Sequence, residues 1–191
     1  QERLSEWLSW LPLIAALAAA EAIETIAPTK VAVKWPNDLL IDGRKVGGIL
    51  CESGTTAGSE PFQIIGIGLN VNGEQDSFPE ELRETATSIH QELGSLIDRN
   101  RLLAQLLQEL EICLDEYAQR RAERIALAYR QRCSTIGKTV KALLADGSEF
   151  IGVAETIGHD GSLTVIQRPI SDNRRSAEVR QLRAADIVHL R

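Results

Sequence analysis

The stretch KWPNDLLIDGRKVGGILCE, residues 34–52, carries the pattern that decides the fold. The valine-rich, alternating residues Thr29–Trp35 predict a strand that leads into it. Leu39–Ile41 predicts a second short strand, and Lys45–Glu52 predicts the strand that returns. Asp42–Gly43 joins these two strands and is typical of a type I′ hairpin turn, in which both central residues need positive φ angles. We therefore expect a strand followed by a β-hairpin.

Segments on both sides of this stretch extend the predicted sheet. Phe62–Val71 is apolar except at its glycines, so we expect it to be a long strand in the middle of the sheet. Ser53–Glu60 is rich in small residues and is expected to form a loop. Beyond Pro12, an alanine- and leucine-rich stretch that reaches Ile26 predicts a buried helix before the sheet.

Helical patterns follow these strands. Pro79 suits the first turn of a helix, because that position needs no backbone donor. Asp98 is a candidate N-cap, and apolar residues recur at helical spacing from there to Tyr117, which predicts a helix with one packing face. Ala122–Arg132 predicts a further helix, and the helical pattern stops at Cys133–Lys138.

From Thr139 onward the pattern changes to short strands with tight Asp-Gly turns. We expect five short strands, with a polar hairpin at Arg168–Ser176 before the last one, and this arrangement is typical of a small β-barrel. The boundary between the two parts of the chain is predicted near residue 135. The clearest strand segments are Thr139–Leu144, Glu149–Ile157, Leu163–Gln167 and Asp186–Leu190.

The composition excludes several classes of protein. The chain has 191 residues, of which 43% are hydrophobic and 25% charged, as in an average soluble globular protein. A disordered tail and a collagen-like fibre are therefore excluded. The net charge of -6 argues against bulk electrostatic binding to nucleic acid or to an anionic membrane. Residues 134–191 carry a net charge of +1, so residues 1–133 carry -7.

The terminus and the cysteines bear on the origin of the chain. The sequence has no methionine and begins with Gln1, so we predict that the N-terminal part of the protein is missing. Its three cysteines are widely spaced and form no CxxC motif, which favours a reducing cytoplasm over a disulfide framework or a zinc site. The apolar run Trp10–Ala20 lacks a basic flank and is too short to span a bilayer. We predict a cytoplasmic protein without a membrane segment.

The densest cluster of chemically unusual residues lies in the opening stretch. Asn37 and Asp38 follow Pro36 at a turn, where their side chains can accept hydrogen bonds or hold a hydrated cation. Lys45 follows a rigid hairpin, which defines the position of its ammonium group. Gly47–Gly48 removes two side chains, so a flat ligand can approach the backbone. Each feature alone is ordinary turn or strand chemistry, but together they favour a functional site.

These motifs resemble a known family. KWPND, RKVGGILCE and IIGIGLNVN resemble the biotin protein ligases, the biotin–[acetyl-CoA-carboxylase] ligases, and GSEFIGVAETIGHDGSL resembles their C-terminal domain. The resemblance covers essentially the whole chain and implies an α+β fold. Residues 1–135 would form an incomplete catalytic domain of the class II synthetase type, with a mixed sheet and packed helices. Residues 136–191 would form a small SH3-like β-barrel.

The resemblance implies a two-step reaction. Biotin and ATP would give biotinyl-5′-AMP and pyrophosphate, with Mg²⁺ assisting. A lysine of the biotin carboxyl carrier domain of acetyl-CoA carboxylase would then attack the mixed anhydride and release AMP. Both steps bring negative charges together, so the site needs positive charge near the carboxylate and the α-phosphate.

Particular residues match the positions that carry this reaction in the family. Lys45 matches the catalytic lysine, which contacts the biotin carboxylate and later the phosphoryl linkage. Gly48, Ile49 and Leu50 match the strand that lines the biotin pocket, so the resemblance assigns them, with Lys45, to biotin binding.

Further matches concern the nucleotide and the metal. Asn37 and Asp38 match the polar pair near the phosphates, with Asp38 as the ligand of the divalent cation. Asn70 matches a position close to the adenosine, although a simple cap at the end of a strand explains it equally well. Arg191 matches a C-terminal arginine that reaches toward the nucleotide, although a disordered end would explain it as well.

The sequence also departs from the family. The arginine- and glycine-rich loop of the GRGRxGR type, which covers biotinyl-AMP, is absent upstream of the helix. We therefore expect this chain by itself to bind biotin weakly and to be weakly active or inactive. It also has no N-terminal helix-turn-helix, so no DNA-binding domain is expected. An exposed sheet edge would allow a homodimer.

Two alternative functions remain open at this point. A lipoate-ligase-like enzyme would also adenylate a carboxylate, and it shares the catalytic architecture implied by the resemblance. A non-catalytic module that only docks the carrier domain would explain the missing loop. KWPND together with the predicted small barrel favours biotin, and the retained Lys45 with its glycine strand argues against a module without catalysis.

Overall fold

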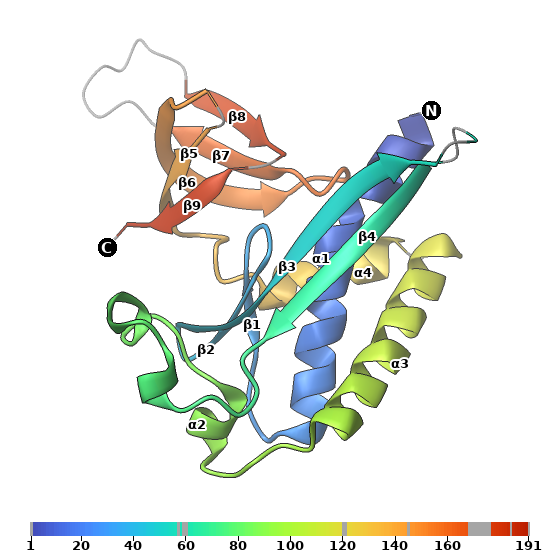
Figure 1. Cartoon of the computed structure of the whole chain (residues 1–191). Helices are drawn as coiled ribbons and strands as arrows, with labels where there is room; N and C mark the ends of the chain where they lie inside the picture. The colour runs from blue at the N-terminus through green and yellow to red at the C-terminus, as the bar shows by residue number, and fades with distance from the viewer. Residues whose placement is uncertain are drawn as a thin grey trace.

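A computed structural model describes residues 2–56, 58, 61–119, 122–144, 146–167, 177–183 and 185–190. Its described residues form two antiparallel sheets with helices packed against the first one (Figure 1). The first sheet has four strands in the order β1-β2-β3-β4, and the second has five in the order β8-β7-β6-β5-β9. The α+β prediction is confirmed.

The first sheet is formed by β1 (Ala32–Lys34), β2 (Asp38–Ile41), β3 (Arg44–Thr55) and β4 (Pro61–Leu69). The predicted hairpin joins β2 and β3. Asp42 has a φ angle of 48° and Gly43 one of 80°, so both central residues are in the left-handed region, as a type I′ turn requires.

Two predictions for this sheet are wrong. The strand predicted for the middle of the sheet, β4, is an edge strand. Its residues alternate between half-buried and exposed positions, and Phe62 and Ile64 are exposed. An apolar run therefore did not imply burial on both faces. The predicted loop at Ser53–Glu60 begins too early, because β3 continues to Thr55 and Ser53 pairs with Gln63 of β4.

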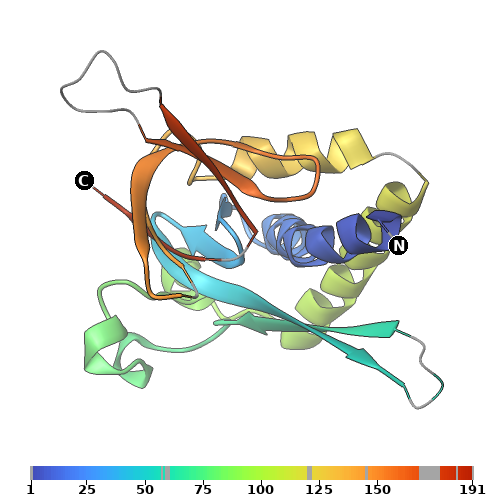
Figure 2. The ribbon, with the colours of Figure 1, turned by 90° about the horizontal axis from the view of Figure 1, so that it is seen from above.

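The central helix α1 spans Glu2–Ile26 and includes Pro12, so the expected helix start after Pro12 is wrong. Figure 2 shows α1 between the β3–β4 ribbon and α4, and it contacts both. Leu8–Ile26 is long and apolar enough to cross a membrane, contrary to the length argument made from Trp10–Ala20. In this structure, however, most of that segment is buried. Its fully buried residues are Ile14, Ala15, Ala16, Ala18, Ala19, Ala20, Ala22 and Ile23.

The remaining helices are α2 (Ile89–Leu93), α3 (Arg99–Ala118) and α4 (Ala122–Arg132). The predicted N-cap of α3 is confirmed, because the Asp98 carboxylate accepts hydrogen bonds from the backbone N–H groups of Asn100 and Arg101. The helix expected at Pro79 is a single 3₁₀ turn, η2 (Glu80–Leu82), and a similar turn, η1 (Gln75–Ser77), precedes it. The sequence reasoning missed α2.

The second sheet consists of β5 (Thr139–Leu143), β6 (Glu149–Ile157), β7 (Leu163–Gln167), β8 (Glu178–Leu182) and β9 (Asp186–His189). The prediction of five short strands is confirmed. A closed SH3-like barrel is not confirmed, because no ladder joins β8 to β9 within the described residues. The polar hairpin predicted at Arg168–Ser176 lies outside the described residues. The division near residue 135 stays a prediction.

Two turns of the second sheet share the sequence Asp-Gly-Ser. The Asp160 carboxylate accepts hydrogen bonds from the Ser162 hydroxyl at 2.5 Å and from the Ser162 backbone N–H at 3.2 Å. Asp146 makes the same pair of contacts with Ser148. The hydroxyl contact is the main reason that the pKa of Asp160 lies below the usual value for an aspartate, and partial burial opposes it.

This lowered pKa predicts a pH dependence of stability. The Asp160 carboxylate contributes its full stabilisation above its unfolded pKa of about 4, and the contribution is lost as pH falls through the lower folded pKa. In Asp160→Asn this contribution is absent at every pH. We expect urea unfolding between about pH 5 and pH 2 to show a steeper loss of unfolding free energy in the wild type than in Asp160→Asn. Parallel profiles would contradict this assignment.

Candidate active site

Three charged side chains meet at the start of the hairpin. The Lys45 Nζ of β3 lies 2.5 Å from Asp38 Oδ1, and the Lys34 Nζ lies 3.8 Å from Asp38 Oδ2. Asp38 is only 21% exposed, whereas the Lys45 side chain is 50% exposed. The carboxylate therefore anchors an ammonium group that remains open to solvent.

A β-bulge sets the direction of Lys45. Leu39 pairs with Gly47 and Leu40 pairs with Lys45, so Val46 is an extra residue on β3. Val46 is fully buried, and Lys45 is exposed. Bulges of this kind redirect side chains near functional sites. Here the bulge turns the lysine outward while the valine anchors the strand in the core.

The two glycines after the bulge have different roles. A Cβ atom on Gly47 would lie 2.6 Å from the Gly68 carbonyl oxygen, so this position excludes a side chain for steric reasons. A Cβ atom on Gly48 would lie 3.4 Å from Cε and 3.5 Å from Nζ of Lys45. The lysine side chain therefore passes directly over Gly48, and a glycine there leaves it room.

The predicted biotin-binding residues lie on two faces of the sheet. Gly48 pairs with Gly68, and Leu50 pairs with Gly66, on the outward face that carries Lys45. Leu50 is 63% exposed. The side chain of Ile49 is buried on the opposite face, but its backbone is fixed by Asn37. The Asn37 side-chain amide donates to the Ile49 backbone carbonyl, and the Ile49 backbone N–H donates to the Asn37 backbone carbonyl, both at 2.8 Å. Gly48 and Leu50 therefore reach the site on the face that carries Lys45, whereas Ile49 is connected to it through its backbone.

Asn70 follows the end of β4 and connects the nearby segments. Its side-chain Nδ2 donates to the Thr87 carbonyl at 3.0 Å and lies 3.5 Å from the Lys45 carbonyl. Within the described residues, its Oδ1 has no hydrogen-bond partner. Asn70 therefore caps local backbone groups and still presents an acceptor. It lines a cleft of about 520 Å³. The other lining residues are Leu69, Val71, Asn72, Gly73, Ser77, Phe78 and Arg99.

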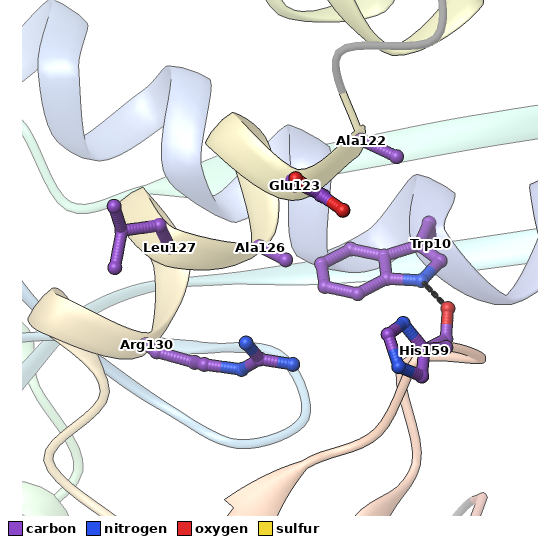
Figure 3. Close-up of a pocket in the computed structure, with 7 residues that line it drawn as sticks. All are labelled: Trp10, Ala122, Glu123, Ala126, Leu127, Arg130 and His159. Atoms are coloured by element: carbon purple, nitrogen blue, oxygen red, sulfur yellow. Dashed lines mark hydrogen bonds between the residues drawn. The ribbon is translucent and has the colours of Figure 1, made fainter.

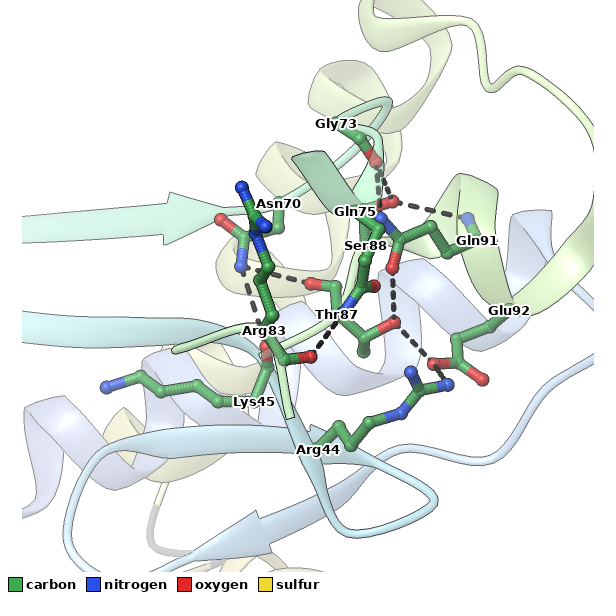
Figure 4. A network of polar contacts seen from close by, with 10 residues as sticks. All are labelled: Arg44, Lys45, Asn70, Gly73, Gln75, Arg83, Thr87, Ser88, Gln91 and Glu92. Carbon is green, nitrogen blue, oxygen red and sulfur yellow. Dashed lines mark hydrogen bonds and ion pairs between the residues drawn. The ribbon is translucent and has the colours of Figure 1, made fainter. Parts of the chain in front are cut away.

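Segment 83–92 holds the backbone of Lys45 in place. The Lys45 N–H donates to the Thr85 carbonyl at 2.7 Å, and its carbonyl accepts from the Thr87 N–H at 2.9 Å. The Thr87 hydroxyl donates to Glu92 at 2.5 Å, and Glu92 also pairs with Arg44 at 2.6 Å. Figure 4 shows that the Lys45 side chain points away from this network. The network therefore fixes the backbone and leaves the ammonium group available.

The sequence reasoning missed this network and one further cation. Arg83 is half-buried, and its Nε donates to the Phe78 carbonyl at 3.1 Å at the wall of the cleft. No carboxylate in the described part of the chain forms an ion pair with it. A sequence signal was available for α2, which carries Glu92 of this network. Ser88 followed three residues later by Gln91 is typical of a capping box at a helix start.

Most of the predicted site residues are brought together. Lys45, Asp38 and Asn37 lie at one end of the hairpin with Gly48 beneath the lysine. Asn70 joins them through the Lys45 carbonyl. Arg191 lies outside the described residues, so its predicted contact with a nucleotide stays a prediction.

Comparisons with known proteins show which family the chain is similar to. The sequence profile of the Biotin/lipoate A/B protein ligase family matches residues 4–72. A biotin--[acetyl-CoA-carboxylase] ligase of Mycobacterium tuberculosis is 35% identical over 185 residues, which cover 95% of this chain and 63% of the relative. Residues 4–72 therefore carry a domain of the biotin/lipoate A/B protein ligase family. The matched residues include the KWPND hairpin and the Asn70 segment.

Two further members of the family extend the comparison. The bifunctional ligase/repressor BirA of Bacillus subtilis is 37% identical over 153 residues, or 80% of this chain and 47% of the relative. The chain therefore spans about half to two thirds of these relatives. Biotin protein ligase from Aquifex aeolicus has the same fold, with a TM-score of 0.80 at 24% identity, covering 96% of this chain and 76% of that structure.

The contrast between Gly47 and Gly48 can be tested by substitution. We expect Gly47→Ala to lower the unfolding free energy by about 2 kcal/mol or more, because the added methyl group meets a backbone carbonyl. Gly48→Ala should change it by less than about 1 kcal/mol, because the group it meets is a flexible side chain. Chemical denaturation of both variants measures this difference. An equal loss of stability would show that Gly48 is also a packing requirement.

Proposed function

We propose that the protein activates biotin with ATP to give biotinyl-5′-AMP and then transfers the biotinyl group to a lysine of a biotin carboxyl carrier domain of acetyl-CoA carboxylase. The observation that carries the proposal is the exposed Lys45 ammonium, held by Asp38 across Gly48 and beside the Asn70 cleft. The names of the relatives support it, as does a structure with this fold that was solved with biotin and ATP and has a TM-score of 0.77.

The charges of the Lys45–Asp38 pair suit the first step, the adenylation of biotin. The biotin carboxylate would attack the α-phosphorus, and the bond to pyrophosphate would break. Negative charge then accumulates on the phosphoryl oxygens, and Lys45 is the cation placed to neutralise it. Its ammonium is a compact charge on a flexible stem, so it can move from Asp38 to the substrate oxygens. In the second step the carrier lysine would attack the carbonyl carbon, and AMP would leave.

The outward face of β3 and β4 suits the apolar part of biotin. Gly48, Gly66 and Gly68 leave this face flat, and Leu50 and Ile64 present exposed apolar side chains on it. A flat apolar surface next to one fixed cation matches a ring system that ends in a carboxylate. The apolar residues would hold the ring and chain, and Lys45 would fix the charged end.

Mg²⁺ is part of the proposal, and the residues present fit it. Asp38 supplies one carboxylate at the edge of the site, next to the Asn37 side chain. One carboxylate suffices for Mg²⁺, because this ion takes its remaining ligands from phosphates and water. When bound, Mg²⁺ would neutralise phosphate charge. Asp38 would hold it, and Lys45 would release Oδ1 as it turns to the substrate.

Two further proposals concern the setting of the protein. We propose a cytoplasmic location, supported by the three free cysteines of the described chain. We also propose that β4, which is an edge strand among the described residues, pairs two copies of the chain, because an edge strand presents unpaired backbone groups.

The substrate assignment is tested by pyrophosphate exchange in the full-length protein. We expect exchange of pyrophosphate into ATP to require biotin, because only a bound carboxylate can accept the adenylyl group. Lipoate should support the exchange at least about tenfold less well at equal concentration, which corresponds to about 1.4 kcal/mol. A preference for lipoate would favour the lipoate branch of the family. Carrier binding without any exchange would favour a docking module.

The role of Lys45 is tested in the same assay. We expect Lys45→Ala to slow exchange by about 100-fold or more, because it removes the charge that stabilises the transition state. Lys141→Ala is a matched control, since it breaks an exposed pair with Glu149 at 3.1 Å in the second sheet. The control should keep the wild-type rate. A near-normal rate for Lys45→Ala would overturn the catalytic assignment.

A further inference from the structure

Trp35, inside the KWPND motif, is held by residues that follow α4 in the sequence. Its side chain is 1% exposed, and its indole N–H donates to the Gly161 carbonyl at 3.0 Å. Gly161 lies in the turn between β6 and β7 of the second sheet. The backbone N–H of Trp35 donates to the buried Thr135 hydroxyl, also at 3.0 Å. Both groups therefore bind elements that follow α4.

The residues on either side of Trp35 are fixed in the same way. The Val33 carbonyl accepts from the Ser134 N–H at 2.8 Å. The Pro36 carbonyl lies 3.4 Å from the hydroxyl of Tyr129, a fully buried residue of α4. Val33, Trp35 and Pro36 are thus anchored by α4 and by the chain that leads into the second sheet.

The last strand contributes as well. The Nε2 atom of His189, in β9, lies 3.2 Å from the Thr135 hydroxyl. Burial, together with the charges of Lys34 and Lys138, lowers the pKa of His189, so its ring is neutral near pH 7. The connecting segment and the β6–β7 turn therefore bind Trp35 directly, and β9 contacts the Thr135 side chain that binds it.

The same motif segment, residues 33–38, also positions the proposed site residues. Asn37 is two residues after Trp35, and it fixes the backbone of Ile49 through two hydrogen bonds. Asp38 follows and holds Lys45. The Gly161 carbonyl is therefore linked to the Asp38–Lys45 pair through the Trp35 indole and the short backbone stretch 35–38.

We propose that Trp35 is a positioning residue through which the docked second sheet fixes the Asp38–Lys45 pair; this rests on the proposed function of that pair. The indole hydrogen bond to Gly161 holds the motif segment against the turn, and this keeps Asp38 at the distance that aims Lys45. When the contact is lost, the fold remains, but the cation no longer occupies one position.

The molecule offers a matched control. Trp10, in α1, is 2% exposed and donates its indole N–H to the His159 carbonyl at 2.6 Å (Figure 3). His159 belongs to the same β6–β7 turn, but Trp10 is not part of the motif segment. Trp35→Phe and Trp10→Phe therefore each remove one buried indole hydrogen bond to that turn, and only the first touches the path to Lys45.

A second matched pair perturbs the acceptor side. Gly161 and Gly147 both follow an aspartate in Asp-Gly-Ser turns, with φ angles of 75° and 80°. A Cβ atom on Gly161 would lie 3.2 Å from the Ser9 carbonyl oxygen, whereas one on Gly147 would meet nothing within 4 Å. Both alanine variants share the backbone strain of a positive φ angle. Only Gly161→Ala also displaces the turn that Trp35 binds.

The test compares the four variants of the full-length protein in three measurements. These are the melting temperature, steady-state pyrophosphate exchange, and hydrogen–deuterium exchange of the peptides that cover residues 36–50. We expect the two tryptophan variants to lose similar thermal stability. Trp35→Phe should lower kcat about tenfold, the factor that one buried hydrogen bond supports. Its KM for biotin should stay within about twofold, because a misaimed cation affects the transition state more than ground-state binding.

Deuterium uptake in residues 36–50 should rise in Trp35→Phe and Gly161→Ala, and remain at the wild-type level in Trp10→Phe and Gly147→Ala. Equal effects of Trp35→Phe and Trp10→Phe on kcat and on this uptake would overturn the proposal. If the wild type shows no biotin-dependent exchange, the proposed function fails. Deuterium uptake then decides by itself whether Trp35 couples the second sheet to the motif segment.

Discussion

The β-bulge at Val46 is the constraint on which the site depends. In a regular strand, Lys45 would share a face with Gly47 and would point away from the face of Gly48. The extra residue changes this, so the lysine lies over Gly48. With it, Val46 enters the core while Lys45 turns toward Asp38. Segment 83–92 then binds the displaced backbone groups of Lys45. The polar network in the site is therefore a consequence of one irregularity in strand pairing.

The site also depends on contacts made far along the chain. The motif segment provides Asn37 and Asp38, but its rear is held by residues 129–135 and by the β6–β7 turn. Such a site is assembled from parts that are distant in sequence. Its geometry is a property of the whole fold, in which a small sheet without any of the proposed reacting groups still shapes the chemistry.

Local chemistry could be predicted from the sequence, and non-local contacts could not. The Asp42–Gly43 turn and the Asp98 cap follow from the conformations that those residues favour, and both are confirmed. The edge position of β4 was missed because an apolar run looks the same whether one or both faces are covered. Asn37, Asp38 and Lys45 could be singled out within one short motif. Arg83 and Thr87 could not, because only folding brings segment 83–92 beside β3.

The alanine-rich helix α1 has a consequence for how the chain folds. Most of its central part is buried by β3, β4, α3 and α4, all of which come later in the sequence. During synthesis α1 therefore leaves the ribosome well before its partners exist. Until residue 132 has emerged, part of this apolar helix is uncovered, and long-range contacts of this kind form slowly. A helix that is largely buried in the native protein is thus uncovered while it is being synthesised, and only the later elements cover it.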